Sequence, residues 1–197
     1  YRKRTDWQAS MHPLFKEVIR NDFAAMNELQ LRGVKRYGPG VYDKNILAEA
    51  ANQNVNILYA SWVDTYLNYI ADHEKLEENA AEIVDAIEGR MKERQIKAWH
   101  LGNPVWDELA ENYGKPELDY QRKAYLKWLR DLAQKIKKVD DSRPLSIEVK
   151  YHPYLVDTID EIDRAVPDLD ANGVITPKGQ IKAKDLARLN SPALPLF

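Results

Sequence analysis

Residues 32–63, RGVKRYGPGVYDKNILAEAANQNVNILYASWV, decide the fold class. The short run Val34–Tyr37 predicts a strand that a Gly-Pro-Gly turn brings to an end. Lys44–Asn52 then predicts a helix with Asp43 at its N-cap. Val55–Val63 is rich in β-branched and aromatic residues, as expected of a buried strand. A strand, a helix and a strand in this order predict a βα unit and hence a parallel sheet.

The same alternation continues on both sides of this stretch. Apolar residues at three- and four-residue spacing predict the helices, and short β-branched runs predict the strands. The predicted helices are His12–Leu31, Glu74–Arg94, a long helix with its apolar stripe from Tyr125 to Ile136, Leu155–Val166 and Lys182–Leu189; the predicted strands are Ile96–Leu101, Leu145–Val149 and Ala171–Thr176. We expect an irregular aromatic loop between Gly102 and Pro116, and Leu194–Phe197 looks like the opening of another strand.

Two architectures use six or so βα units: a doubly wound sheet and a (βα)8 barrel. The sequence contains neither G-x-G-x-x-G nor G-x-x-x-x-G-K-[ST], so the usual signal of a nucleotide-binding doubly wound sheet is missing. We therefore predict an α/β fold, a (βα)8 TIM-barrel-like single domain over residues 1–197. A complete barrel needs about 250 residues, so this one is expected to be partial or abridged and incomplete at its ends.

Composition limits the class of protein and its partners. With 197 residues, 44% of them hydrophobic, the chain can bury a real core, and disorder as the main state is excluded. The net charge of -2 gives no bulk attraction to nucleic acid. No apolar run approaches the roughly 18 residues of a membrane span, so no membrane partner is expected. Five Trp and eleven Tyr beside three Phe are typical of sugar-binding clefts, although such residues also fill cores and rims.

Three phrases carry a family resemblance. Arg36-Tyr37-Gly38-Pro39 is similar to an R-x-Y-x-P pattern at the end of a second barrel strand. Lys97–Asn103, KAWHLGN, resembles a fourth strand in which Trp, Gly and Asn lead into an acid/base glutamate, and Asp141–Pro144 resembles the approach to a fifth strand. In this order the phrases resemble clan A glycoside hydrolases, retaining (βα)8 enzymes that include family 2 and family 5 members. The resemblance implies a barrel and a carbohydrate ligand, a β-linked glycan.

One position departs from that family. Where the resembling enzymes carry the acid/base glutamate, this sequence has Pro104. A retaining glycosidase needs two carboxyl groups about 5 Å apart, and proline supplies none. Asp107 and Glu108 lie three and four residues further on, and the second carboxylate is expected beyond Phe197. We therefore assign no catalytic residue and predict a glycoside hydrolase-like barrel with an incomplete carboxylate pair. The alternative is a non-catalytic or engineered TIM-barrel scaffold that binds a glycan or nothing.

Four residues at predicted strand ends are candidates for substrate binding, because barrel sites lie at the carboxyl ends of the strands. They are Arg36, Trp62, His100 and Asn103. The resemblance implies that Arg36 supports the nucleophile, that Asn103 holds the 2-hydroxyl of a sugar, and that Trp62 stacks on a sugar face. Arg36 could equally form a surface ion pair, Trp62 could pack at the rim, and His100 could point into the core instead of the cleft.

Other chemistry has little support in the sequence. The four histidines include no pair at i, i+3 or i+4, so we predict no metal site, and no cofactor is expected. No G-x-S-x-G motif indicates a serine nucleophile. A barrel that is short of strands leaves unpaired backbone groups, so self-association or a completing segment is expected. The compartment is left open.

Overall fold

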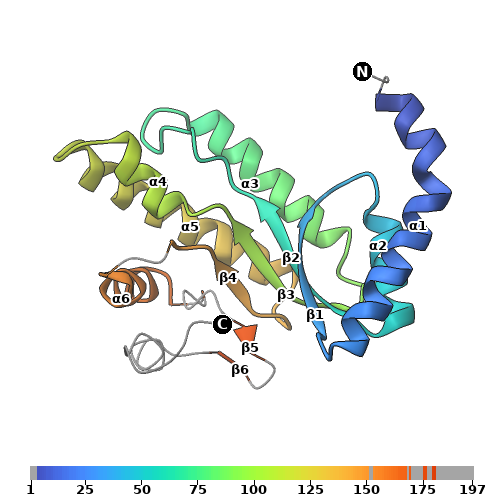
Figure 1. The fold of residues 1–197 in the computed structure, drawn as a ribbon. Helices are drawn as coiled ribbons and strands as arrows, with labels where there is room; N and C mark the ends of the chain where they lie inside the picture. Colours follow the sequence, from blue (N-terminus) through green and yellow to red (C-terminus); the bar gives the residue numbers. More distant parts are fainter. Residues whose placement is uncertain (1–3, 151–152, 168, 170–174, 177–178, 181–197) are drawn as a thin grey trace.

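Four parallel strands form the central sheet, in the order β1-β2-β3-β4 (Figure 1). They are β1 (Gly33–Gly38), β2 (Asn56–Trp62), β3 (Ile96–Gly102) and β4 (Leu145–Ile147). The structure is a computed structural model that describes residues 4–150, 153–167, 169, 175–176 and 179–180. Each strand pairs with the next strand along the chain, so all four carboxyl ends meet at one edge of the sheet.

Six helices connect and flank these strands within the described residues: α1 (Arg4–Glu28), α2 (Asp43–Gln53), α3 (His73–Glu88), α4 (Val105–Asn112), α5 (Glu117–Val139) and α6 (Leu155–Ala165). Helices α3 and α5 pack against each other along one face of the sheet, and α1 packs against α2 beside β1 (Figure 1). None of the helices in the described part is long and apolar enough to cross a membrane.

The core lies between the sheet and these helices. Every second residue of a strand faces this layer, and there β2 contributes Ile57 and Tyr59 while β3 contributes Trp99 and Leu101, all 3% exposed or less. The indole of Trp99 donates to Asp140, just after α5, over 2.8 Å. The intervening residues of the strands face the opposite side, where polar side chains gather near the carboxyl ends.

The region after β3 differs from the sequence prediction. In place of an irregular loop, Val105–Asn112 forms the helix α4, so this prediction is wrong. Its buried residues Val105, Trp106 and Leu109 lie at helical spacing, and Asp107 and Glu108 occupy the first turn, where acidic side chains favour the helix dipole. The segment is only about two turns long, so the helical spacing of its apolar residues is not recognisable in the sequence.

Three predicted helices also have other bounds. Helix α1 begins at Arg4 and ends at Glu28, where the prediction was His12–Leu31. Asp43 is the first residue of α2, and Tyr42 occupies the cap position, so the predicted N-cap is wrong. The carboxylate of Asp43 instead accepts a hydrogen bond from Tyr59 and binds Arg90. Helix α3 ends at Glu88 and not at Arg94, because Gly89 caps it and its N–H bonds to Asp85.

The parallel α/β sheet and its helices form a partial TIM-barrel-like arrangement, without a closed barrel in the described residues. Ile175–Thr176, the described part of the predicted strand 171–176, is β5, which pairs antiparallel with β6 (Gly179–Gln180) and does not extend the parallel sheet. The predicted helix 182–189 and strand 194–197 lie outside the described residues. Self-association and a completing segment stay predictions.

Candidate functional site

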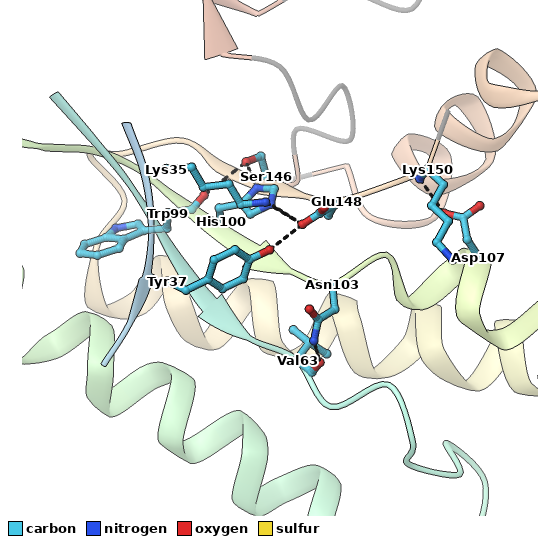
Figure 2. A network of polar contacts seen from close by, with 10 residues as sticks. All are labelled: Lys35, Tyr37, Val63, Trp99, His100, Asn103, Asp107, Ser146, Glu148 and Lys150. Carbon is cyan, nitrogen blue, oxygen red and sulfur yellow. Dashed lines mark hydrogen bonds and ion pairs between the residues drawn. The ribbon is translucent and has the colours of Figure 1, made fainter. Parts of the chain in front are cut away.

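A cluster of polar side chains lies where the strands end, on the face of the sheet away from α3 and α5. Lys35 and Tyr37 of β1 point to this face, and Glu148 follows β4 (Figure 2). The carboxylate Oε2 of Glu148 lies 2.6 Å from Lys35 Nζ and accepts a hydrogen bond of 2.7 Å from the Tyr37 hydroxyl. We refer to Lys35, Tyr37, His100 and Glu148 as the Glu148 cluster.

His100 is the buried member of this cluster, with only 3% of its surface exposed. Its Nδ1 lies 2.9 Å from the hydroxyl of Ser146, the neighbouring residue on β4. Its Nε2 lies 3.6 Å from Glu148 Oε2 and forms no hydrogen bond within the part of the chain that the structure describes. The nearby carboxylate favours a proton on Nε2; in that tautomer Nδ1 accepts from the Ser146 hydroxyl, which also lies 3.5 Å from the backbone oxygen of Trp99. An N–H donor is therefore left without a partner beside a carboxylate.

The cluster fixes the charge of its members. Burial raises the pKa of Glu148, but the hydrogen bonds from Lys35 and Tyr37 outweigh it and hold that pKa at about 2. Burial, aided by the positive charge of Lys35, lowers the pKa of His100 to about 4. At neutral pH the site thus contains an ionised carboxylate, a charged lysine and a neutral histidine. Glu148 is consequently a hydrogen-bond acceptor and a poor proton donor.

Trp62 and Asn103 lie beside this cluster. Trp62 is 61% exposed at the end of β2, and its ring meets the ring of Tyr37 edge-on at 5.9 Å. Asn103 follows β3 with a left-handed φ of 70°, and its amide donates to the backbone oxygen of Val63 over 2.6 Å (Figure 2). Asn103 thus ties the exits of β2 and β3 together, while the substrate-binding roles of both residues stay predictions.

Arg36 lies apart from the other three candidates. Alternation along β1 places it on the helix-facing side, where its guanidinium is 3.0 Å from Asp43 Oδ1. Asp43 also lies 2.8 Å from Arg90 and accepts a hydrogen bond of 2.5 Å from the hydroxyl of Tyr59. The ion-pair interpretation of Arg36 describes this geometry, although the carboxylate it pairs with is buried. We refer to Arg36, Asp43, Tyr59 and Arg90 as the Asp43 cluster.

The carboxylates that follow Pro104 are held away from the cluster by Lys150. Pro104 immediately precedes α4. Asp107 accepts a hydrogen bond of 2.7 Å from the backbone N–H of Lys150 (Figure 2). The Nζ of Lys150 lies 2.7 Å from Glu108. In the described residues, no group of three His, Asp or Glu side chains could hold a metal ion.

Lys35, Tyr37 and Glu148 are not among the four candidate site residues predicted from the sequence. A signal was present, because Lys35 and Tyr37 flank Arg36 and must face the side opposite to it. Glu148 likewise stands two residues after Ser146, so both point the same way. The partners in these pairs are 111 to 113 residues apart, and no local pattern predicts such contacts.

No family model matches the chain, and no curated protein does. Among solved structures, a β-glucuronidase of Bacteroides uniformis is 16% identical, covers 68% of this chain and 16% of its own, and has a TM-score of 0.55. A Bacteroides uniformis β-glucuronidase 2, covalently bound to cyclophellitol-6-carboxylate aziridine, is 17% identical with the same coverage and TM-score. The endo-1,4-β-mannanase of Rhizomucor miehei is 14% identical, with 68% and 52% coverage and a TM-score of 0.47.

These are glycoside hydrolases. At such low identity the likeness shows the fold alone, so part of this chain shares its fold with part of a β-glucuronidase. The chain spans about 16% of the length of the two glucuronidases.

Proposed function

We propose that this chain binds a β-linked glycan at the carboxyl ends of its strands and does not hydrolyse it. The observation that carries the proposal is the unpaired Nε2 of His100, which lies 3.6 Å from an ionised carboxylate oxygen of Glu148. A sugar hydroxyl is both a donor and an acceptor. One hydroxyl can donate to the exposed carboxylate of Glu148, and a small movement of that side chain lets the same hydroxyl accept from the buried Nε2 of His100, a group that is otherwise costly to leave unpaired.

The aromatic residues next to the cluster suit a sugar ring. Trp62 has 61% of its surface exposed and is braced by the edge of Tyr37. Aromatic faces of this kind pack against the apolar C–H groups of a pyranose while the hydroxyls reach polar side chains. The fold shared with part of a β-glucuronidase also supports a carbohydrate ligand.

Hydrolysis lacks its proton donor in this arrangement. The pKa of Glu148, about 2, leaves it ionised, and an acid for glycoside cleavage must carry a proton at working pH. Asp107 and Glu108 are engaged with Lys150, and position 104 is proline. We expect aryl β-glycosides to remain intact at background rates, in line with an incomplete carboxylate pair.

Titration calorimetry with a neutral β-linked oligosaccharide and a β-glucuronide tests the proposal. We expect binding that falls about tenfold in Glu148→Gln and in Trp62→Ala. Tyr120→Ala is the matched control, because Tyr120 on α5 is an aromatic residue with the same 61% exposure. Equal losses in the control variant, or no binding by the unaltered chain, would overturn the proposal and favour a scaffold without a ligand. Turnover of an aryl β-glycoside would refute the non-hydrolytic part.

A further inference from the structure

A second hollow lies on the other side of the β2 end, between that end and helix α3. Its volume is about 490 Å³, and it is lined by Pro39, Ser61, Trp62 and the side of α3 that carries Asn79, Glu82 and Asp85. None of these residues belongs to the Glu148 cluster. The hollow is large enough for one sugar unit.

Ser61 is the residue that indicates a ligand site in this hollow. The residue is 3% exposed, and its hydroxyl makes no hydrogen bond within the described part of the chain. Asn79 differs, because its amide donates to the backbone oxygen of Trp62 over 3.3 Å and accepts from the N–H of Asp64 over 3.5 Å. A ligand hydroxyl that bonds to the Ser61 hydroxyl would give it a partner, whereas Asn79 holds the wall in place.

The rim of the hollow is acidic. Glu82 and Asp85 lie three residues apart on α3, and both are exposed. Among the described residues neither side chain has a hydrogen bond or an ion pair. Two unpaired carboxylates on the same side of a helix create a negative potential, and a ligand with a positive charge would gain from it.

Trp62 lies between the hollow and the Glu148 cluster, which are on opposite sides of the β2 end. This residue lines the hollow, and its ring also meets Tyr37, which donates to Glu148. A glycan that passes over the exposed ring of Trp62 would reach the cluster with one unit and the hollow with the next. We infer that the hollow binds a sugar unit that carries a protonated amine, with a hydroxyl on Ser61 and the amine near Glu82 and Asp85. This inference rests on the proposed glycan binding.

Calorimetry on the full chain with three β-linked tetrasaccharides tests the inference: a glucosamine oligomer with free amines, its N-acetylated form, and a neutral glucose oligomer. We expect the amine-bearing oligomer to bind about tenfold tighter than the other two, since two exposed carboxylates each contribute a modest attraction. The preference should disappear in the double variant Glu82→Gln/Asp85→Asn and above about 0.5 M salt. Ser61→Ala should weaken all three oligomers by a similar factor.

Glu74→Gln is the matched control, because it removes the same charge from α3 about 16 Å along the helix from Asp85. Equal affinity for the three oligomers would overturn the inference and leave the proposed glycan binding intact. No binding of any oligomer would overturn both. Tighter binding of a lysine-rich peptide, lost in the same double variant, would assign the hollow to a basic protein segment and would also overturn the inference.

Discussion

Two clusters of similar composition lie on opposite faces of one sheet. The Asp43 cluster and the Glu148 cluster each combine a carboxylate, a basic residue of β1 and a tyrosine that donates to the carboxylate. They differ in exposure: the side chain of Asp43 is 7% exposed, and that of Glu148 is 36% exposed. The carboxylate of Asp43 is buried between β1, β2 and the segment after α3, whereas the carboxylate of Glu148 is exposed at the ends of the strands.

This difference indicates what each cluster does. Asp43 is surrounded by two arginines and a tyrosine from its own chain. Glu148 has partners on one oxygen, and the neighbouring His100 still has an unpaired N–H. The Asp43 cluster also contains an unpaired N–H, that of Arg36 Nε, so the difference lies in exposure: the buried cluster holds elements together, whereas the exposed carboxylate of Glu148 can accept a ligand.

The largest expected effect is loss of the sealed carboxylate. Asp43→Asn should lower the free energy of unfolding by about 3 kcal/mol, because Arg36 and Arg90 would be left partly buried without a counter-charge. Chemical denaturation measures the change. Asp85→Asn, an exposed aspartate on α3, is the control and should change it by less than about 0.5 kcal/mol. A loss below about 1 kcal/mol for Asp43→Asn would mean that the cluster is not sealed.

Two glycine substitutions test how far the tyrosine of each cluster can move to relieve a steric clash. A Cβ at position 38 would lie 1.9 Å from the Tyr59 hydroxyl, and one at position 102 would lie 2.3 Å from the Tyr37 ring. We expect Gly38→Ala to cost about 2 kcal/mol and Gly102→Ala about 1 kcal/mol, since Tyr37 can move outward. Gly114→Ala, with nothing within 4 Å, is the control in the same denaturation series. Equal losses of unfolding free energy in Gly38→Ala and Gly102→Ala would contradict the expected difference in rigidity between the two clusters.

Acid should weaken the fold through His100. The pKa of His100 is lowered from 6.5 to about 4 in the folded chain, so between these values the unfolded chain binds a proton that the folded chain does not. Stability therefore falls as the pH falls through this window, by about 1–2 kcal/mol at pH 5. His100→Gln should flatten the profile of unfolding free energy between pH 6.5 and 4. An unchanged slope would show that His100 is not the group responsible.

The smallest expected effect on stability concerns Glu148. Because its side chain is more than a third exposed, Glu148→Gln should cost less than about 1 kcal/mol at pH 7. The pKa of Glu148 is lowered from 4.5 to about 2, so its contribution is present above pH 4.5 and disappears as the pH falls toward 2. Denaturation at pH 7 and pH 3 measures both values. A cost of 2 kcal/mol or more at pH 7 would place Glu148 with the sealed cluster.

Much of the fold was predictable from local patterns. Apolar periodicity located α2, α5 and the four parallel strands, because each buries one regular face. Helix α4 was missed, since eight residues show too few turns for the period to be visible.

The site was less predictable than the fold. Strand ends indicated His100, Trp62 and Asn103, which lie at one edge of the sheet. Arg36 was grouped with them because it lies near the end of its own strand, β1, yet alternation places it on the other face of the sheet. The contacts that define the two clusters join distant residues, such as Lys35 and Glu148, and only the paired strands bring these together.

The order of the strands bears on how the chain reaches its fold. Because β1, β2, β3 and β4 are neighbours in both sequence and space, each pairing closes a single βα connection and waits for no later segment. Chains with such short-range pairing fold faster than those in which the first and last strands must meet. The sheet can therefore grow from the N-terminal end as the ribosome releases the chain, one strand at a time.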